Sequence, residues 1–187
     1  EKFNLKTFPV PFLLEEIKEN IPNSTNTVSS LSKERIIEQA FQFHSQGNIT
    51  QAAKYYQNFI DKGYKDYRVF SNYGIILKSL GNLQEAEISY RKAIELNPNF
   101  ANAHLNLGNI LKDLGNLIEA ELSYRKAIEL NPNFAEAYYN LGLILIDLDK
   151  SKEAEIFTRK AIELNPNLAE AYSNLGSILT NVGNLNE

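Results

Sequence analysis

The sequence predicts an all-α protein folded as a solenoid of antiparallel helical hairpins, and two observations carry this prediction. First, the chain repeats every 34 residues from Tyr67 onward, and the phrase AIELNPN begins at Ala93, Ala127 and Ala161. A fixed period in this range is typical of stacked repeat architectures. Second, each period holds two stretches whose apolar residues recur at helical spacing, separated by a turn residue. Because a lone hairpin leaves an apolar stripe in water, the hairpins must stack on one another.

The period divides the chain into a leader, residues 1–32, and a repeat domain, residues 33–187. We place the repeats at 33–66 (a degenerate copy), 67–100, 101–134 and 135–168, followed by a partial copy at 169–187. In the leader, Phe8 and Phe12 belong to an apolar stretch with two prolines, and a polar linker follows. We expect either a disordered arm or a segment that docks on apolar surface of this or a neighbouring chain. Because the last copy stops partway, we expect a fragment or a missing cap.

The repeat at 101–134 shows how each hairpin forms. Its first helix aligns one apolar face, made of Ala103, His104, Leu107, Gly108, Leu111 and Leu114. Gly115 then ends this helix, and Asn116 three residues before Glu119 predicts a capping box at the start of the second helix. That second helix ends at Asn131, because Pro132 lacks an N–H and biases the preceding residue away from helical geometry. His104 on the packed face is predicted to be buried.

Two further sets of residues recur with the repeat. Small residues are predicted to let the helices approach closely: Gly74, Gly108, Gly142 and Gly176 in the first helices, Ala86, Ala120 and Ala154 in the second. Glu–Arg pairs at i, i+4 stabilise a helix by about 0.2–0.5 kcal/mol each. These pairs are predicted to lie on solvated outer surface: Glu87–Arg91, Glu121–Arg125 and Glu155–Arg159. Asp149 takes the left-handed turn position that glycine holds elsewhere.

Together these residues resemble the tetratricopeptide repeat family. In the repeat at 135–168 the family pattern is matched by Tyr138, Leu141, Gly142, Leu145, Ala154, Thr158, Ala161 and Pro166. The resemblance covers residues 33–187, most strongly from Tyr67, and implies a right-handed superhelix whose concave face binds peptides. The sequence departs from the pattern at His104, at Thr158, and in the first copy, where Gln39 and Ala40 replace Leu-Gly.

Each first helix carries a second stripe, opposite its packed face, at the spacing 4, 3, 4. In successive repeats the stripe is Arg68, Asn72, Ile75 and Ser79; Asn102, Asn106, Asn109 and Asp113; Glu136, Asn140, Leu143 and Asp147; Glu170, Asn174, Ser177 and Asn181. Between the repeats at 67–100 and 101–134, fifteen of the last sixteen residues are identical but only two of the first nine. The first helix has therefore changed while the second has stayed the same. Selection for a diversified recognition surface would produce this difference, and so would random drift on a solvent face without a function.

One asparagine stays constant within this varying stripe, as Asn72, Asn106, Asn140 and Asn174. Asparagine is a poor helix residue, but its carboxamide both donates and accepts, and so matches a peptide bond. The ladder resembles the asparagine groove in the repeat domains of O-linked N-acetylglucosamine transferases, which implies that it holds extended polypeptide by the backbone. The alternative is a consensus residue inherited by duplication.

Other side chains near this ladder would select a partner. They are the amides Asn102 and Asn109, the apolar Tyr139, Leu143 and Ile146, the cations Arg68, Lys78 and Lys112, and the anions Asp113 and Asp147. Their mixed charge does not resemble the dense basic clamp with which some family members grip a C-terminal carboxylate.

Composition excludes several function classes. The net charge of −4 and pI near 5.4 argue against nucleic-acid binding, which needs a basic stripe. There is no cysteine for a disulfide or thiolate zinc site, no apolar run long enough to span a membrane, and no phosphate-binding loop. The two histidines are too far apart to cooperate. We therefore expect no catalysis, cofactor or metal, and a reducing, cytoplasmic compartment.

We accordingly expect a protein–protein interaction scaffold that binds an extended peptide of a partner in the concave groove through the asparagine ladder. One alternative is the substrate-recruiting repeat arm of a larger transferase. Another is a self-associating module, in which apolar residues of the last helix or of the leader meet a second copy. Those residues are Leu175, Ile178, Leu179 and Val182, with Phe8 and Phe12.

Overall fold

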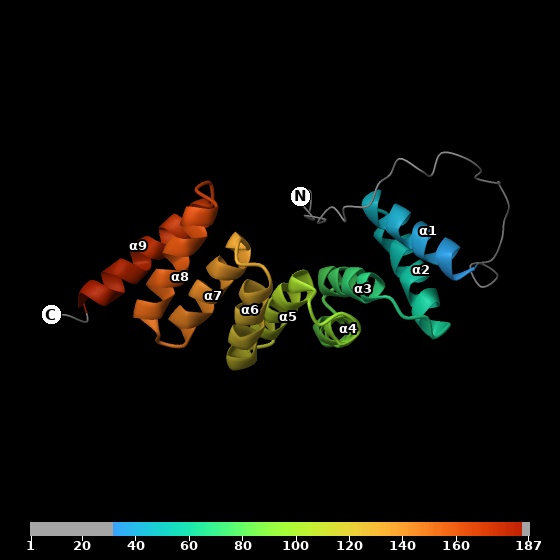
Figure 1. The fold of residues 1–187 in the computed structure, drawn as a ribbon, viewed down its shortest axis with the longest axis horizontal. Coiled ribbons are helices and arrows are strands. Elements are labelled where there is room, and N and C mark those ends of the chain that lie inside the picture. The colour runs from blue at the N-terminus through green and yellow to red at the C-terminus, as the bar shows by residue number, and fades with distance from the viewer. Residues whose placement is uncertain (1–31, 185–187) are drawn as a thin grey trace. The chain divides into compact units, whose positions relative to one another are not determined.

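The computed structural model describes residues 32–184, and every regular element in that range is an α-helix (Figure 1). The chain forms two compact units that divide between Tyr64 and Lys65. Unit 1 contains α1 (Lys33–Ser45) and α2 (Ile49–Asp61). Unit 2 contains α3 (Tyr67–Ser79), α4 (Leu83–Leu96), α5 (Ala101–Asp113), α6 (Leu117–Leu130), α7 (Ala135–Asp147), α8 (Ser151–Leu164) and α9 (Ala169–Asn184). Phe8 and Phe12 lie outside the described residues.

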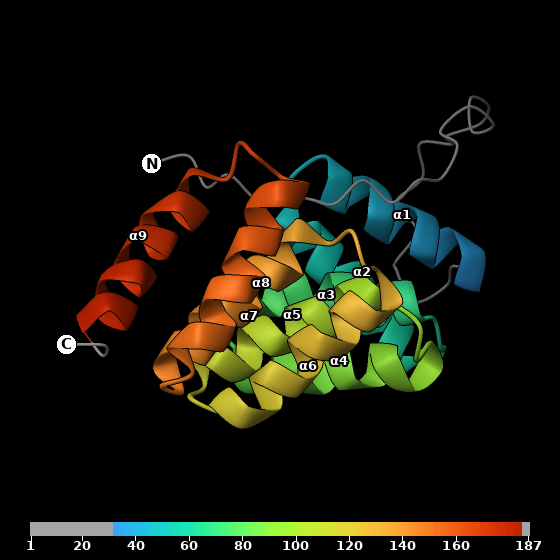
Figure 2. The same ribbon diagram turned by 60° about the vertical axis from the view of Figure 1, so that its left-hand side comes forward.

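The helices of unit 2 stack as hairpins in chain order (Figure 2). Helix α3 pairs with α4, α5 with α6 and α7 with α8, while α4 packs on α5, α6 on α7 and α8 on α9. The first helices α3, α5, α7 and α9 also contact one another in sequence. Contacts are therefore concentrated between helices one or two places apart, which is the arrangement of a repeat solenoid. The predicted all-α solenoid of hairpins is confirmed.

The helix ends follow from the turn residues, with one correction. Gly115 has φ +81° and Asp149 has φ +59°, so both occupy the left-handed turn conformation. After α6, Asn131 is extended, with φ −138° and ψ 90°, as expected of a residue before proline. The predicted capping box at α6 is wrong, because Asn116 makes no side-chain hydrogen bond at this helix start. Its φ and ψ of −84° and 64° differ from the extended conformation of a typical N-cap.

Close approach of the paired helices depends on a glycine that faces a tyrosine. A Cβ atom on Gly74 would lie 2.8 Å from the ring of Tyr90, and one on Gly108 would lie 2.6 Å from the ring of Tyr124. Both rings are fully buried, and this burial raises the pKa of each hydroxyl. The predicted role of these two glycines as close-contact residues is confirmed, whereas the same prediction for Gly176 is wrong, because a Cβ there would meet no described atom within 4 Å.

The third hairpin of unit 2 solves the same packing problem with a different pair of residues. Where the other hairpins have Ser-Tyr, it has Phe157 and Thr158. The buried Thr158 hydroxyl faces Gly142, where a Cβ would lie 2.5 Å from its oxygen. The ring of Phe157 lies 6.0 Å from that of Tyr138, and the Arg125 guanidinium lies 5.2 Å from the Phe157 centroid. The large side chain thus stands one residue earlier in α8, at Phe157, than in α6, where it is Tyr124. Phe157 packs near Arg125 of the preceding hairpin, and the smaller Thr158 faces the glycine.

Glu121 corrects the prediction that all the Glu–Arg pairs are solvated. The three pairs do form, each with a 2.8 Å ion pair. Glu121, however, is a buried residue that also accepts a 2.8 Å bond from Lys150 Nζ of the next hairpin. Burial alone would raise the pKa of Glu121, but hydrogen bonds from Lys150 and Arg125 outweigh it and lower this pKa. Lys150 lies in the turn between α7 and α8. One repeat earlier, in the turn between α5 and α6, its place is taken by Asn116, which offers Glu87 no equivalent cationic partner.

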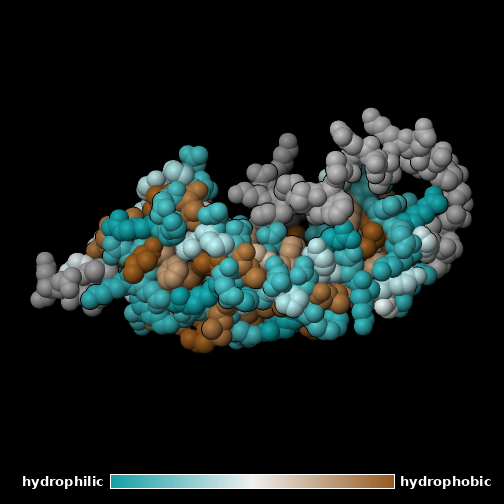
Figure 3. Space-filling view, in the orientation of Figure 1, coloured by the Kyte–Doolittle hydropathy of each residue, from teal (hydrophilic) through white to brown (hydrophobic). Residues whose placement is uncertain are grey.

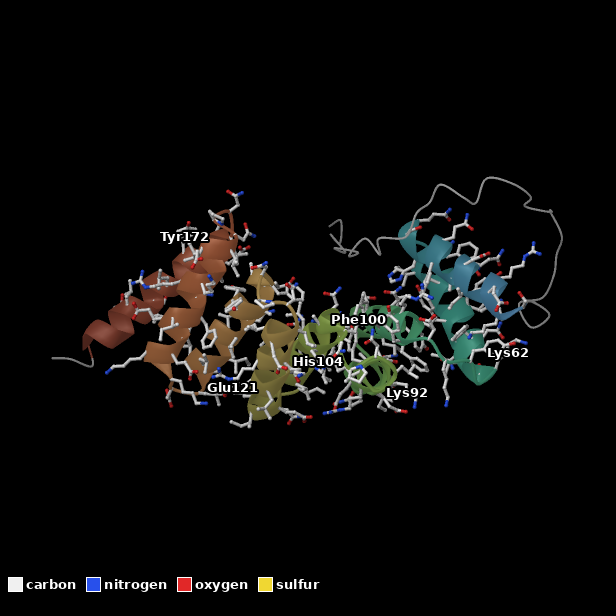
Figure 4. The ribbon with its side chains drawn as sticks, viewed as in Figure 1. Lys62, Lys92, Phe100, His104, Glu121 and Tyr172 are labelled. Carbon is white, nitrogen blue, oxygen red and sulfur yellow. The ribbon has the colours of Figure 1, made fainter. Side chains whose placement is uncertain are left out.

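The two histidines occupy different environments. His104 was predicted to be buried, and this is wrong: it is partly exposed on α5, and its Nε2 donates to the carbonyl of Pro98 at 2.9 Å (Figure 4). His44 is buried in unit 1, where its Nδ1 lies 3.1 Å from the hydroxyl of Tyr56. Its Nε2 has no hydrogen-bond partner among the described residues. Burial lowers the pKa of His44, so it stays neutral at pH 7.

The glycine contacts generate a paired prediction. Replacing Gly108 with alanine should lower the unfolding free energy by about 1–2 kcal/mol. The methyl group would clash with Tyr124, and the energetic cost of this overpacking exceeds the gain in helix propensity. The control is Gly176→Ala on α9, where a Cβ would meet nothing within 4 Å. This variant should gain roughly 0.5–1 kcal/mol from helix propensity alone. Urea unfolding measures both, and equal effects would contradict the close-contact role of Gly108.

The Glu121 contacts generate a second prediction. Replacing Glu121 with glutamine should cost about 1–2 kcal/mol of unfolding free energy, since it removes a partly desolvated charge with two cationic partners. The matched control is Glu87→Gln, at the same place in α4, which should change stability by less than about 0.5 kcal/mol. Thermal unfolding followed by circular dichroism distinguishes the two. Equal losses would show that the Lys150 contact contributes nothing.

Candidate functional site

The second stripes of the first helices form one continuous polar surface in unit 2. We call this surface the A face and define it by the predicted binding residues Arg68, Asn72, Lys78, Asn102, Asn106, Asn109, Lys112, Asp113, Tyr139, Asn140, Leu143, Ile146, Asp147 and Asn174. Side-chain bonds link each helix to the next. Lys78 Nζ on α3 lies 3.3 Å from Asp113 Oδ2 on α5. Asn140 Nδ2 on α7 donates to Asn109 at 3.0 Å, and Asn174 Nδ2 on α9 donates to the Tyr139 hydroxyl at 3.1 Å.

Asn140 and Asn109 form a structural node within the A face. Asn140 is only 8% exposed. Its partner, Asn109 Oδ1, also accepts a 2.8 Å bond from the hydroxyl of Tyr124, whose ring fills the space against Gly108. The pairing thus connects two neighbouring hairpins to the core of the first of them. Asn140 therefore has a structural role between two hairpins, which the sequence did not predict.

Asn72 and Asn106 are the members of the ladder that are available to a partner. Both are partly exposed, and neither side chain makes a hydrogen bond to another residue in the range 32–184. Asn174 is intermediate, because one amide hydrogen is committed to Tyr139. The four asparagines share a position in the repeat but differ in their partners. From the sequence they are equivalent. Among the residues that the structure describes, however, Asn72 and Asn106 have no side-chain partner, Asn174 has one, and Asn140 is buried and bonded to Asn109.

Ion pairs neutralise most of the candidate cations of the A face. Arg68 binds Asp66 through two nitrogens, at 3.0 and 2.7 Å. Burial alone would raise the pKa of Asp66, but these bonds from Arg68 outweigh it and lower that pKa. Lys78 is paired with Asp113. Lys112 and Asp147 make no ion pair with any residue that the structure describes. The face is therefore close to neutral and mostly polar.

The apolar part of the A face is confined to α7. Tyr139, Leu143 and Ile146 are each partly exposed, so they could contact an apolar side chain of a partner. Ile146 also packs against the core of unit 2, which holds its side chain in place. Tyr139 keeps its hydroxyl engaged with Asn174. The apolar patch thus lies beside the asparagines and not among the ion pairs.

The residues predicted for self-association on α9 separate into two groups. Ile178 is 1% exposed, so its assignment to an exposed stripe is wrong: it faces the preceding hairpin and belongs to the core. Leu179 is 43% exposed and Leu175 is partly buried, whereas the side chain of Val182 lies outside the described part of the chain. Tyr172, labelled in Figure 4, is 50% exposed on the same helix and was not predicted.

Two surface hollows of about 480 Å³ each lie away from the A face. One is lined by residues of α4, α5 and α6, including Leu122, and the other by residues of α7 and α8, including Ile156. Within residues 32–184 no three His, Asp or Glu side chains gather as a metal site would require. The same range contains no helix with the length and apolar character needed to span a membrane.

Comparison with known proteins identifies the repeats. A family model described as "TPR repeat" matches residues 74–115 and 108–149. Two models described as "Tetratricopeptide repeat" match residues 135–168 and 157–187. Together these matches cover residues 74–187 without a gap. No curated protein matches the chain.

Solved structures share the fold. The structure of MamA from Desulfovibrio magneticus is 21% identical, with 86% of this chain and 88% of that chain aligned and a TM-score of 0.73. The protein YrrB, titled "a TPR protein with an unusual peptide-binding site", is 22% identical over 76% of this chain and 73% of its own, with a TM-score of 0.70. The first TPR of Spaghetti (RPAP3), described as bound to HSP90 peptide SRMEEVD, is 26% identical over 63% of this chain and 93% of its own, with a TM-score of 0.62.

The division of the asparagines predicts opposite effects on stability. Replacing Asn140 with alanine should lower the unfolding free energy by about 0.5–1 kcal/mol, because a lost buried hydrogen bond outweighs the better helix propensity of alanine. Replacing Asn106, at the same place one repeat earlier, should raise it by roughly 0.5 kcal/mol through propensity alone. Urea unfolding of both variants measures the difference. If the two variants had the same unfolding free energy, the Asn140–Asn109 hydrogen bond would contribute nothing to stability.

Proposed function

This chain belongs to the tetratricopeptide repeat family, and on that premise we propose that it is a protein-interaction scaffold whose A face binds an extended segment of a partner polypeptide. The observation that carries the proposal is a pair of partly exposed carboxamides, Asn72 and Asn106, which lie one repeat apart on neighbouring first helices and make no hydrogen bond to any residue within 32–184. Each can donate to a carbonyl and accept from an N–H of an extended backbone. YrrB is described as having a peptide-binding site and the first TPR of Spaghetti (RPAP3) as bound to an HSP90 peptide, and both have this fold.

The charges of the A face indicate which kind of peptide it suits. Two of its three candidate cations are already paired, Arg68 with Asp66 and Lys78 with Asp113. A strongly acidic peptide would have to compete with these internal carboxylates for its positive partners. The partly exposed Leu143 and Ile146 instead offer apolar contact near the asparagines. The proposed partner segment is therefore extended, near neutral, and bears an apolar side chain.

The finer assignments from the sequence stay predictions. These are the resemblance to the asparagine groove of O-linked N-acetylglucosamine transferases and the role of a recruiting arm for a transferase. The buried Asn140 restricts the ladder, since its carboxamide is engaged by Asn109. A backbone-binding track would thus depend mainly on Asn72 and Asn106, with a smaller share from Asn174.

A peptide-selection experiment tests the proposal. Phage-displayed random peptides selected on the full chain should yield binders, and replacing both Asn72 and Asn106 with alanine should weaken them by roughly ten- to a hundredfold, as expected for the loss of two to four exposed hydrogen bonds. The matched control replaces Asn99 and Asn133, two exposed asparagines in the turns between repeats. Calorimetry gives the affinities, and unfolding curves show that both variants are folded. Equal affinities in the two double variants, or no selected peptide, would refute the A face as a peptide site.

A further inference from the structure

The hairpin of unit 1 contains a buried ionisable side chain, His44, at a position where two other repeats have a lysine. His44, Lys78 and Lys112 stand 34 residues apart, near the end of α1, α3 and α5. Lys78 is exposed and Lys112 is partly exposed, so water solvates both amines. His44 is only 7% exposed. The position therefore holds a basic group in all three repeats, but only in unit 1 is that group shut away from water.

Tyr56 on α2 is the polar neighbour of His44. It stands where Tyr90 and Tyr124 stand in unit 2. The hydroxyl of Tyr124 donates to Asn109, a neutral amide. The hydroxyl of Tyr56 instead lies 3.1 Å from Nδ1 of His44, and the two rings meet edge to face with their centroids 5.8 Å apart. The tyrosine at this position thus bonds to a group that cannot titrate in α5 and to one that can in α1.

A proton on His44 would find neither an acceptor nor an anion. Its Nε2 is buried and has no hydrogen-bond partner within residues 32–184. The titratable groups on the buried side of the hairpin are Tyr55 and Tyr56, phenols that are neutral at acid pH. The charged residues of the two helices are all exposed: Lys33, Glu34, Arg35 and Glu38 on α1, and Lys54 and Asp61 on α2. Figure 3 shows a mostly hydrophilic exterior on the coloured part of the face in view. An unpaired charge in an apolar interior is costly.

Unit 1 has a small core with which to resist such a charge. Its regular structure consists of α1 and α2, of 13 residues each. Small folds bury a small fraction of their surface, and elements with few buried contacts open locally at the lowest cost. The chain divides into its two compact units between Tyr64 and Lys65. This division lets α1 and α2 separate from each other while unit 2 stays folded.

The pH dependence of this hairpin follows from the direction of the pKa shift. Burial lowers the pKa of His44 below its ordinary value of 6.5, because it disfavours the charged form. The open hairpin therefore binds a proton more readily than the closed one, and closure is fully stable above pH 6.5 and weakens as the pH falls below it. Asp66 and Glu121 of unit 2 have lowered pKa values, so their stabilisation is lost only below their ordinary values of 3.8 and 4.5. Weakly acidic pH thus acts mainly on unit 1.

From the buried ring of His44, its Nε2 without an acceptor in the described range and the small core around it, we propose that unit 1 is an acid-sensitive hairpin. Protonation of His44 separates α1 from α2 at weakly acidic pH and leaves unit 2, with the A face, folded. The separation exposes the apolar faces of α1 and α2. This device uses no residue of the A face, so it is independent of the peptide site proposed above.

Amide hydrogen exchange of the full chain tests the proposal. After correction for intrinsic rates, the amides of α1 and α2 should exchange about three- to thirtyfold faster at about pH 5 than at about pH 7, as expected for linkage to one proton. Those of α3 to α9 should change by less than about twofold. His44→Phe keeps a ring in the core but cannot be protonated, so it should abolish the acceleration in unit 1. The matched control is His104→Phe, which removes the other histidine and should retain it.

Two further measurements keep the test decisive if His44→Phe does not fold. His44→Asn also carries a neutral polar group that cannot titrate, and circular dichroism at about pH 7 shows which variant is folded. His104→Phe leaves His44 as the sole histidine, so its ring signals in nuclear magnetic resonance spectra can be followed directly. They should titrate with a midpoint below pH 6.5. A midpoint at or above this value, equal acceleration in both units, or an acid effect that persists in a folded His44 variant would overturn the proposal.

Discussion

The contact between a glycine of one helix and the ring of the next is the constraint on which unit 2 depends. At Gly74 and Gly108 a methyl group would enter the space of Tyr90 and Tyr124. The absent side chain sets the separation of the paired helices, and the large ring fills the volume that their crossing leaves. Because the helices are held close, the hydroxyl of Tyr124 reaches through to Asn109 on the A face. Core packing and the polar surface are therefore parts of one arrangement.

The hairpin of α7 and α8 shows that the tyrosine facing the glycine can be replaced, provided that a neighbouring side chain supplies a ring of similar volume. Thr158 is too short to reach the A face as Tyr124 does, and the position equivalent to Asn109 is Leu143. The missing ring is supplied next to it by Phe157, which lies between Tyr138 and the Arg125 guanidinium. The A face thus changes from amide-rich on α5 to apolar on α7, as the core residues behind it change. A partner would meet different chemistry in adjacent repeats of one scaffold.

Prediction from sequence was accurate for most features that the repeat itself carries, although the capping box at Asn116 is an exception. The period, the left-handed turns at Gly115 and Asp149, and the helix stop before Pro132 follow from local chemistry that is copied with each unit. The prediction failed where a side chain depends on the neighbouring hairpin. Glu121 is buried because Lys150 replaces the asparagine of the previous turn, and Asn140 is buried because Asn109 accepts from it. The spacing of residues within one helix does not predict contacts between residues that are 29 or 31 positions apart in the sequence.

The concentration of contacts between helices one or two places apart determines how unit 2 responds to force. A pull on α3 and α9 is carried mainly through the interfaces between successive helices, which hold most of the contacts among the described residues. The link with the least burial opens first, and the hairpins on either side can remain folded while it does. Refolding needs only short loops to close, so it should be rapid. Under tension, unit 2 should therefore extend in steps of one hairpin.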